Sequence, residues 1–314
     1  MKLIVQIPCY NEEATLSIAL ADLPREVPGF DKVEWLIIDD GSTDDTVKIA
    51  RENGVDHIIS HTQNQGLAHA FMTGIDSCLD LGADVIVNTD ADNQYNADDI
   101  AALTVPILNH QAEIVIGARN IETIEHFSLV KKFLQKLGSW VVRVASKTDI
   151  PDAPSGFRAF SCSAAQHLMV FSDYTYTLET VIQAGQKNIA ICSVPIRVNE
   201  NLRPSRLVKS IPSYIKLSII TIVRIFIIYR PFSFFSTIAI IFFGLGFLIG
   251  LRFMIYYFNG QGGGHIQSLI LAALLLGVGF TTLLTAFITD LLAANRKLLE
   301  DVRFRLRSQK NSDR

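Results

Sequence analysis

The sequence has few of the residues that build disulfide frameworks or zinc sites. It contains four cysteines in 314 residues, none of them in a CxxC spacing, and its seven histidines are scattered. This usage fits free thiols in a reducing cytosol and argues against a zinc motif. The formal net charge of −3 argues against general nucleic-acid binding.

A secretory signal is also missing. The apolar run from Leu3 to Ile7 stops at Pro8, and a polar run follows. This run is too short for the core of a signal peptide. We therefore expect the N-terminal part of the chain to stay in the cytoplasm, where it is made.

Apolar residues are unevenly distributed along the chain. The stretch from Ile211 to Leu292 is overwhelmingly apolar, whereas charged and apolar residues alternate before it. Phe232–Leu251 and Ile266–Thr289 carry no charge, and each reaches the roughly 20 helical residues that span a bilayer. We expect these two runs to form a transmembrane hairpin within residues 231–292.

Basic residues predict the orientation of this hairpin. The tail of residues 293–314 contains Arg296, Lys297, Arg303, Arg305, Arg307, Lys310 and Arg314. By the positive-inside bias, this basic tail and a domain of residues 1–205 share the cytoplasmic side. The sequence thus predicts an integral, multi-pass protein of the cytoplasmic membrane.

A basic stripe precedes the hairpin. Drawn as a helix, residues 206–230 place their cations within an arc of about 120°, and these cations are Arg206, Lys209, Lys216, Arg224 and Arg230. We interpret the segment as an amphipathic helix in the membrane interface, facing lipid phosphates. The alternative is a third spanning helix, which would carry charges into the bilayer and move the tail to the other side.

The N-terminal domain shows alternating strand and helix patterns. Strands are predicted at Lys2–Ile7, Glu34–Ile38, His57–Ile59, Val85–Asn88 and Ile114–Gly117, and helices at Thr15–Leu23, Thr46–Asn53, Leu67–Leu81 and Ala97–Asn109. The run from Ser42 to Asp45 has the spacing of a capping box. The alternation predicts an α/β fold with a doubly wound, mostly parallel sheet.

Polar clusters follow three of these strands. They are Pro8–Glu13, Asp39–Ser42 and Asp90–Gln94. Ligands of parallel sheets bind beyond the carboxyl ends of the strands, so we expect the three clusters to form one site. Asp40 is placed for a nucleobase or ribose, or alternatively caps the helix from Thr46.

Asp90 and Asp92 form a DxD pair on a loop that follows a strand. Alternate carboxylates of an extended loop converge on one hard cation, and Gln94 offers a neutral oxygen ligand. We expect Mg²⁺ or Mn²⁺ here, bridging a nucleotide diphosphate and stabilising the departing group. A DxD pair alone is weak evidence, because any acidic loop can contain one.

Seven motifs follow one another along about residues 3–210, namely IPCYNEE, IIDDGSTDDT, NQGL, NTDADNQY, IGAR, PSGFRAF and RPSRL. In these motifs and their order the chain resembles family 2 glycosyltransferases of the dolichyl-phosphate mannose synthase type. The two-helix tail is similar to that of bacterial polyprenyl-phosphate glycosyltransferases. The resemblance implies a GT-A fold, a Mg²⁺ or Mn²⁺ requirement and inversion at the anomeric carbon.

The resemblance also implies roles for particular residues. The nucleotide would be lined by Pro8, Tyr10, Glu12, Ile38 and Asp40, and the metal and diphosphate would be held by Asp90, Ala91, Asp92 and Gln94. Arg119 would face the donor, and Ser155-Gly156-Phe157 would form the acceptor loop. The acceptor phosphate would meet Ser155, Gly156, Arg203 and Arg206, and Arg158 would also suit the acceptor side. The chain departs from the family at Glu200, where an arginine is usual, and near Thr175, where a lysine is often found.

The implied reaction moves a sugar from a UDP- or GDP-hexose to a dolichyl or undecaprenyl phosphate. A phosphate monoester has a second pKa near 6, so it attacks as a dianion without a general base. This accounts for the lack of an obvious catalytic carboxylate or histidine. The bacterial-like tail inclines the donor toward UDP, and the sequence does not name the sugar.

Two alternatives remain open. A processive polysaccharide synthase would share the nucleotide site but carry a QxxRW-like motif and more spans. A catalytically inactive, membrane-anchored nucleotide-sugar-binding protein would be expected to have a broken DxD pair.

Three glycines of the first apolar run, Gly244, Gly246 and Gly250, would let helices approach closely. A homo-oligomer through the hairpin is therefore a hypothesis.

The acceptor assignment predicts the behaviour of Arg206→Ala. Removing a cation from the lipid phosphate should raise the KM for the polyprenyl phosphate more than the Kd of the nucleotide. Acceptor titrations and nucleotide calorimetry on the same preparation measure the two quantities. Equal weakening of both would assign Arg206 another role.

Overall fold

The computed structural model describes residues 1–119, 140, 142–144, 146–170, 176–199, 220, 223–224 and 226–312. The chain divides into two compact units. The first comprises Met1–Ser218 with Asp301–Arg314, and the second comprises Ile219–Glu300.

A seven-stranded sheet forms the centre of the first unit, in the order β3-β2-β1-β4-β6-β5-β7. Its strands are β1 (Lys2–Cys9), β2 (Lys32–Asp39), β3 (His57–Ser60), β4 (Val85–Asn88), β5 (Ile114–Arg119), β6 (Arg158–Ser161) and β7 (Ile191–Ile196). β6 runs antiparallel to β4 and β5, and the other neighbouring pairs are parallel. The predicted α/β fold with a mostly parallel sheet is confirmed.

The sequence pattern predicts the first five strands and misses β6 and β7. β6 has only four residues and begins with a charged side chain, Arg158. β7 lies at the edge of the sheet and contains Pro195, a residue that edge strands tolerate.

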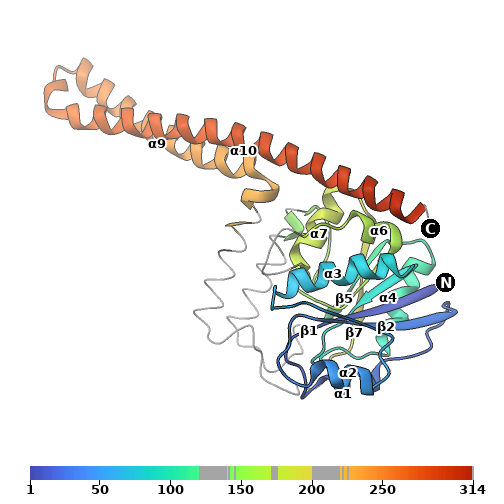
Figure 1. The fold of residues 1–314 in the computed structure, drawn as a ribbon. Coiled ribbons are helices and arrows are strands. Elements are labelled where there is room, and N and C mark those ends of the chain that lie inside the picture. Colours follow the sequence, from blue (N-terminus) through green and yellow to red (C-terminus); the bar gives the residue numbers. More distant parts are fainter. Residues whose placement is uncertain are drawn as a thin grey trace. The chain divides into compact units, whose positions relative to one another are not determined.

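Helices cover both faces of this sheet, with α3 on one face and α1 and α2 on the other (Figure 1). The helices of the first unit are α1 (Leu16–Asp22), α2 (Thr46–Glu52), α3 (Leu67–Asp80), α4 (Asp99–Leu108), α6 (Cys162–His167) and α7 (Thr177–Gln186). Successive side chains of β1 point to opposite faces of the sheet. Leu3, Val5 and Ile7 pack in the core with residues of α1 and α4. Gln6 points the other way, toward Gly74 of α3.

The predicted capping box before α2 is wrong. Ser42 does not cap the helix; its backbone N–H donates to Asp39 Oδ1 at 2.9 Å. Asp44 closes the turn instead, because its Oδ1 accepts from the Thr46 backbone N–H at 3.1 Å and from the Thr46 hydroxyl at 2.5 Å. The local hydrogen bonds of this loop are used to shape the end of β2 rather than to complete a cap.

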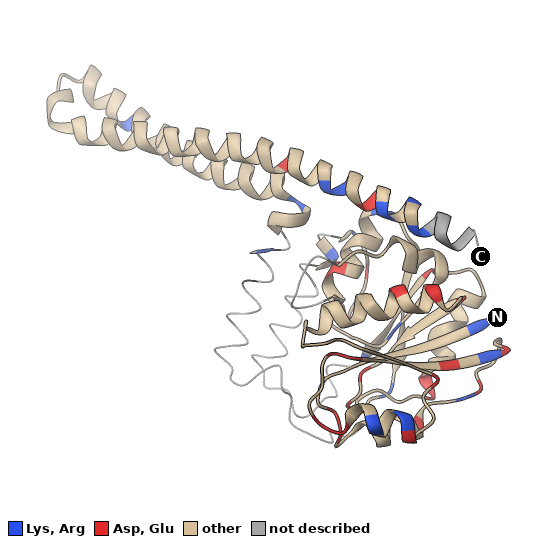
Figure 2. Cartoon of the chain, viewed as in Figure 1, with Lys and Arg blue, Asp and Glu red and all other residues tan. Residues whose placement is uncertain are grey.

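The second unit contains helix α9 (Pro231–Phe258) and most of helix α10 (Ile266–Ser312). Both helices are long and apolar enough to cross a membrane. Charged side chains are sparse along both and return toward the C-terminal end of α10 (Figure 2). The predicted linker from Arg252 is shorter than expected, because α9 continues to Phe258. Only a short turn and the 3₁₀ helix η1 (Gly262–His265) separate the two helices.

The two apolar helices pack through small residues. A Cβ added to Gly246 would lie 3.0 Å from Leu276 Cγ and 3.2 Å from the Ala272 carbonyl oxygen of α10. Glycine therefore permits a close approach of the helices, as in other membrane proteins. Gly250 also faces Ala272, whereas Gly244 has no atom within 4 Å. Two of the three glycines that suggested a homo-oligomer thus face the hairpin itself, and the oligomer stays a prediction.

The predicted interface helix of residues 206–230 falls mostly outside the described residues. Arg206, Lys209 and Lys216 belong to the part that is not described. Phe226–Tyr229 are helical, and Arg230 immediately precedes α9. The interfacial position of this segment remains a prediction.

The C-terminal part of α10 belongs to the first unit. Arg303 Nη2 lies 3.3 Å from Asp76 Oδ2 of α3, and Arg307 pairs with the same carboxylate. Arg307 Nη1 also donates to the Leu168 carbonyl at 2.7 Å, and Phe304 stacks on His167. The predicted basic tail is therefore helical. Its segment Asp301–Arg307 contacts α3, His167 and Leu168.

Glu34 is buried at the start of β2, at the amino ends of the parallel strands. Its carboxylate lies 2.7 Å from Lys2 Nζ, 2.5 Å from Lys32 Nζ and 2.9 Å from His57 Nε2. Burial raises the pKa of Glu34, but the hydrogen bonds from Lys2, Lys32 and His57 outweigh it and lower the pKa to about 2. The charged carboxylate is therefore the stable form in the folded chain.

This cluster predicts a pH-dependent loss of stability on Glu34→Gln. A carboxyl whose folded pKa is depressed stabilises the fold above its unfolded pKa of about 4.5 and loses that contribution as pH falls toward about 2. The variant should be destabilised by about 1–3 kcal/mol at pH 7. The gap to the unmodified chain should close as pH falls below 4.5.

Thermal unfolding of the full chain in detergent, followed by circular dichroism from pH 3 to 8, measures the gap. Asp31→Asn is the matched control, because the Asp31 side chain pairs with the N-terminus while 92% exposed. Asp31→Asn should leave the unfolding temperature nearly unchanged at every pH, because exposed ion pairs contribute little to stability. A Glu34→Gln gap that is absent, or independent of pH, would contradict the assignment.

Candidate active site

The polar clusters expected from the sequence meet at one edge of the sheet. The parallel strands end there at Cys9, Asp39, Ser60, Asn88 and Arg119. The loops that follow are bonded to one another: Asn11 N donates to Ser42 Oγ at 2.9 Å, and Glu12 N donates to Thr46 Oγ1 at 2.8 Å. The loops after β1 and β2 thus form one joined surface.

The residues expected to line a nucleotide occupy different environments in this surface. Pro8 and Ile38 are buried within β1 and β2, so their side chains belong to the sheet. Tyr10 is 43% exposed, whereas Glu12 is buried and accepts from the Thr15 hydroxyl at 2.9 Å. Direct nucleotide contacts by these residues remain predictions.

Asp40 is buried and holds the loop before α3. Its Oδ1 accepts from Gln65 N at 2.9 Å, and its Oδ2 accepts from Gly66 N at 2.8 Å. His61 Nδ1 lies 2.7 Å from the same Oδ1. The alternative that Asp40 caps the helix from Thr46 is wrong, because its bonds lead to α3 instead of α2.

His61 is a residue of this site that the sequence did not single out. Its two ring nitrogens contact Asp40 and, at 3.0 Å, Thr73 Oγ1 of α3. His57 lies four residues earlier in the sequence, but it bonds to Glu34 at the opposite edge of the sheet. No spacing rule separates a histidine that supports a site from one that supports the opposite edge of a sheet.

The Asp90–Gln94 loop is held in a tight turn. Gln94 N donates to Asp92 Oδ1 at 3.2 Å, and Asn93 has a φ of 54°, a left-handed conformation that asparagine tolerates. Asn199, which follows β7, donates from its backbone to the Gln94 carbonyl at 2.9 Å. Arg203 and Arg206 follow shortly after and lie outside the described residues.

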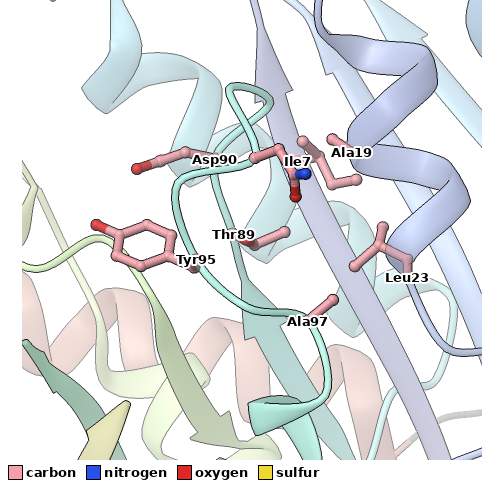
Figure 3. A pocket seen from close by; sticks show the side chains of 8 residues that line it. Ile7, Ala19, Leu23, Thr89, Asp90, Tyr95 and Ala97 are labelled. Carbon is pink, nitrogen blue, oxygen red and sulfur yellow. The ribbon is translucent and has the colours of Figure 1, made fainter. Parts of the chain in front are cut away.

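The Asp90 carboxyl is electrostatically crowded. Burial raises its pKa, and the charge of Asp92 raises it further, while Arg119 and the Tyr95 hydroxyl lower it; the result is about 7. Figure 3 shows the Asp90 carboxyl and the Tyr95 hydroxyl pointing to the same side, beside a small pocket lined also by Leu23 and Ala97. A carboxyl pair in this state is stabilised by a cation.

Gly156 lies directly against Asp90. A Cβ at this position would be 3.0 Å from Asp90 Oδ2 and 3.0 Å from the Tyr176 hydroxyl oxygen. The Gly156 N–H donates to the Tyr95 hydroxyl oxygen at 3.0 Å. The expected acceptor loop and the DxD loop therefore touch, and only glycine leaves the carboxyl its place.

Arg119 is fixed by Asp152, which precedes this loop. The guanidinium donates from Nε at 2.7 Å and from Nη2 at 3.0 Å to the two carboxylate oxygens. Burial lowers the pKa of Arg119, but Tyr95, Asp152 and Asp90 together raise it above its ordinary value. Arg119 is a permanent cation beside Asp90, and its Nη1 is not among the atoms that Asp152 holds.

Arg158 does not occupy the position expected of it. The side chain is fully buried and donates from Nε to the Ser155 carbonyl at 2.7 Å and from Nη1 to the Thr177 carbonyl at 2.8 Å. Burial lowers its pKa to about 10. Its guanidinium thus ties the loop before β6 to α7, which corrects the expectation that it meets a substrate phosphate.

Ser155 carries an unexplained hydroxyl. The residue is fully buried, and within the described part of the chain its Oγ has no hydrogen-bond partner. A buried hydroxyl without a partner costs free energy. Ser155 and Gly156 are the two residues of this loop that we expect at the acceptor phosphate. Ser155 has a hydroxyl available for a hydrogen bond, and Gly156, which has no side chain, lets the loop backbone lie close to Asp90.

The donor set fits a hard divalent cation bound together with a ligand. In the described residues no group of three or more His, Cys, Asp or Glu side chains converges. Mg²⁺ is commonly held by one or two carboxylates plus substrate phosphates and water. Asp90 and Asp92, with the Gln94 amide nearby, match that partial set rather than a closed structural site.

Comparison with known proteins places these features in a family. Residues 4–169 match the glycosyl transferase family 2 model. A UDP-N-acetylglucosamine–dolichyl-phosphate N-acetylglucosaminyltransferase of Methanococcus voltae is 34% identical over 216 residues, covering 61% of this chain and 83% of that protein. An undecaprenyl-phosphate mannosyltransferase of Micrococcus luteus is 26% identical over 207 residues, covering 62% and 83%.

A solved structure shows the same fold. Glucosyl-3-phosphoglycerate synthase of Mycobacterium tuberculosis, determined with Mn²⁺, UDP and glucosyl-3-phosphoglycerate, superposes with a TM-score of 0.53 at 20% identity. The match covers 70% of this chain and 79% of that chain. The GT-A architecture expected for the first unit is confirmed.

The contact between Gly156 and Asp90 predicts the effect of Gly156→Ala. The added Cβ displaces the carboxyl, so divalent-cation-dependent binding of UDP or GDP should weaken by about 10-fold or more. Calorimetry of the full chain in detergent, with and without Mn²⁺, measures this. Gly277→Ala is the control, because a Cβ there meets no atom within 4 Å. Unchanged cation dependence in folded Gly156→Ala would show that the contact is unimportant.

Proposed function

The chain belongs to glycosyltransferase family 2, and from that membership we propose that it transfers a hexose from a nucleotide-sugar to polyprenyl phosphate, with inversion at the anomeric carbon. The product is a polyprenyl-phosphate-linked monosaccharide. The relatives from Methanococcus voltae and Micrococcus luteus are named for transfer to dolichyl and undecaprenyl phosphate. Their matches each cover 83% of the relative's length, which supports the same acceptor class here.

One observation carries the proposal: the donor and acceptor loops are in contact. A Cβ on Gly156 would lie 3.0 Å from the Asp90 carboxyl, and Arg119, at the end of β5, pairs with Asp152 in the segment before β6. Groups suited to a nucleotide diphosphate are therefore in van der Waals contact with a loop suited to an acceptor phosphate. Holding two reactants in this way removes much of the entropic barrier to reaction.

Asp90, Asp92 and Gln94 would hold the divalent cation. The structural relative was solved with Mn²⁺, and another structure of that synthase contains Mg²⁺ and UDP. When bound, such an ion neutralises charge that develops on the leaving diphosphate. The raised pKa of Asp90 supports this role, because a cation relieves the repulsion between the two carboxyls.

Arg119 would supply the permanent positive charge on the donor side. Asp152 fixes the plane of its guanidinium through Nε and Nη2. Nη1 would then donate to a phosphate oxygen of the donor. A preorganised cation needs no rearrangement as charge builds in the transition state, which is the largest source of catalysis in many enzymes.

The acceptor side would need positioning more than proton transfer. The lipid phosphate is largely dianionic at neutral pH and attacks the anomeric carbon directly. The Ser155 hydroxyl, buried and without a partner in the described residues, would donate to that phosphate. Arg203 and Arg206 would add positive charge, and Arg158 would act by holding the Ser155 carbonyl.

Membrane attachment supports the lipid acceptor. Helices α9 and α10 are long and apolar enough to cross a bilayer. We place the catalytic unit and the C-terminus on the cytoplasmic side, following the basic residues of α10. The donor would be a UDP- or GDP-hexose, with UDP favoured by the Methanococcus voltae relative.

A donor panel tests the proposal. Membranes containing the full chain are incubated with polyprenyl phosphate and radiolabelled UDP-glucose, UDP-N-acetylglucosamine, UDP-glucuronate or GDP-mannose. One donor should place label in the lipid extract, in a mild-acid-labile, alkali-resistant form. Binding of a donor without label in lipid would favour the inactive alternative, and polymeric product would favour a processive synthase.

Asp92→Ala tests the metal ligands. The variant should lose at least about 100-fold in transfer, because the leaving diphosphate is no longer neutralised. Asp149→Ala is the matched control, since the Asp149 side chain is 100% exposed, and it should transfer normally. Full activity of Asp92→Ala would remove the metal hypothesis.

A further inference from the structure

A series of hydrogen bonds between buried amide and hydroxyl groups begins at Gln6 of β1, beside α3, and ends at Gly156 in the loop before β6. Gln6 of β1 donates from Nε2 to Asn88 Oδ1 at 2.9 Å. Asn88, at the end of β4, donates from Nδ2 to the Tyr176 hydroxyl oxygen at 2.8 Å and to the Gly156 carbonyl at 2.9 Å. Gln6 and Asn88 are 0% exposed and Tyr176 is 1% exposed.

Hydrogen bonds hold both backbone polar groups of Gly156. Its carbonyl accepts from Asn88, and its N–H donates to the Tyr95 hydroxyl oxygen at 3.0 Å. The α-carbon between them is the point against which the Asp90 carboxyl rests, because a Cβ there would lie 3.0 Å from Asp90 Oδ2. A rotation of this peptide therefore moves the surface that supports Asp90.

The neighbouring elements are shaped to hold the chain of bonds in place. A Cβ on Gly74 of α3 would lie only 2.3 Å from Gln6 Oε1, so the helix leaves a gap that the amide fills. The Tyr176 ring stacks on Phe71 of α3 at 3.9 Å and 6°. Gln6 and Tyr176, the two side-chain partners of Asn88, thus both pack against α3.

Stability alone does not explain this arrangement. Buried polar groups stabilise a fold weakly even when fully paired, and an apolar pair of the same shape is often as stable. Strands β1 and β4 are otherwise lined with apolar residues, among them Ile4, Ile86 and Val87, all buried. Gln6 and Asn88 are the buried polar members of these strands that lead to the Gly156 carbonyl.

We propose that Gln6, Asn88 and Tyr176 are positioning residues that set the cation and diphosphate site by fixing the Gly156 peptide beneath Asp90. All three are buried, so we assign them no direct contact with a substrate. They act through Gly156 on Asp90, and so on the geometry in which the two carboxylates meet a divalent cation. This role rests on the proposed function for its catalytic consequence but not for its effect on cation binding.

The double variant Gln6→Leu/Asn88→Leu tests the proposal directly. Replacing both amides by apolar groups of similar size leaves neither amide unpaired, so the fold should be retained. The Gly156 carbonyl loses its short bond from Asn88 and keeps only the 3.4 Å bond from the Tyr176 hydroxyl. Binding of Mn²⁺ in the presence of UDP or GDP should therefore weaken by about 10- to 100-fold. Electron paramagnetic resonance of free Mn²⁺, titrated into the full chain in detergent, measures the affinity.

Thr104→Val is the matched control. Its hydroxyl is equally buried and donates to the Ala101 carbonyl at 2.9 Å within α4. Losing it should leave the Mn²⁺ affinity unchanged. A folded double variant that binds Mn²⁺ as tightly as the unmodified chain would overturn the proposal.

Tyr176→Phe provides the second test, and it decides the matter if the double variant does not fold. It removes one hydroxyl while keeping the stack on Phe71. Mn²⁺ affinity should fall by about 2- to 10-fold, and kcat should fall while the KM for polyprenyl phosphate stays constant. An unchanged Mn²⁺ affinity, or a loss confined to the acceptor KM, would contradict the assignment.

The two levels of the hypothesis fail differently. If no donor yields a labelled lipid, the proposed function is wrong, yet the Mn²⁺ titrations still report on the Gly156 peptide. If the unmodified chain transfers sugar and the variants bind Mn²⁺ normally, the positioning role is wrong and the proposed function stands.

Discussion

The close contact between the Asp90 carboxyl and the bare α-carbon of Gly156 is the constraint on which the site depends. It joins the loop after β4 to the loop before β6, two segments far apart in sequence. The same contact leaves a partly buried carboxyl beside Asp92, so burial and like charge raise the pKa of Asp90 to about 7. In the proposed function, a divalent cation would relieve the repulsion between these two carboxyls.

The sheet separates two kinds of charge. At the amino ends of the strands, Glu34 is surrounded by Lys2, Lys32 and His57 and is fully compensated within the chain. At the carboxyl ends, Asp90 and Asp92 meet the Arg119–Asp152 pair. The first cluster pairs a carboxylate with cations of the chain, whereas the second brings two carboxyls together at the edge where we propose that a cation binds. This division follows from a parallel sheet, in which all loops on one edge are free to carry function.

The sequence predicted the fold well where periodicity was strong. The first five strands, the helices between them and the two apolar helices follow from apolar patterns, and the DxD pair follows from its place after β4. It did not predict β6 or β7, which are short or contain proline, or the buried Arg158, because nothing local distinguishes a core arginine from one that binds phosphate. The bonds of Asp40 to His61 and of Asn88 to Gly156 span 21 and 68 residues, and pattern reasoning does not detect pairings across such separations.

The central claim is that Asp90 and Asp92 hold a cation in contact with the diphosphate of the donor. Electron–nuclear double resonance on the full chain with Mn²⁺ and UDP or GDP detects phosphorus nuclei directly bonded through oxygen to the metal. The account predicts strong ³¹P couplings in the unmodified chain and their loss in Asp90→Asn. Manganese bound without phosphorus couplings, or couplings that survive in Asp90→Asn, would contradict it.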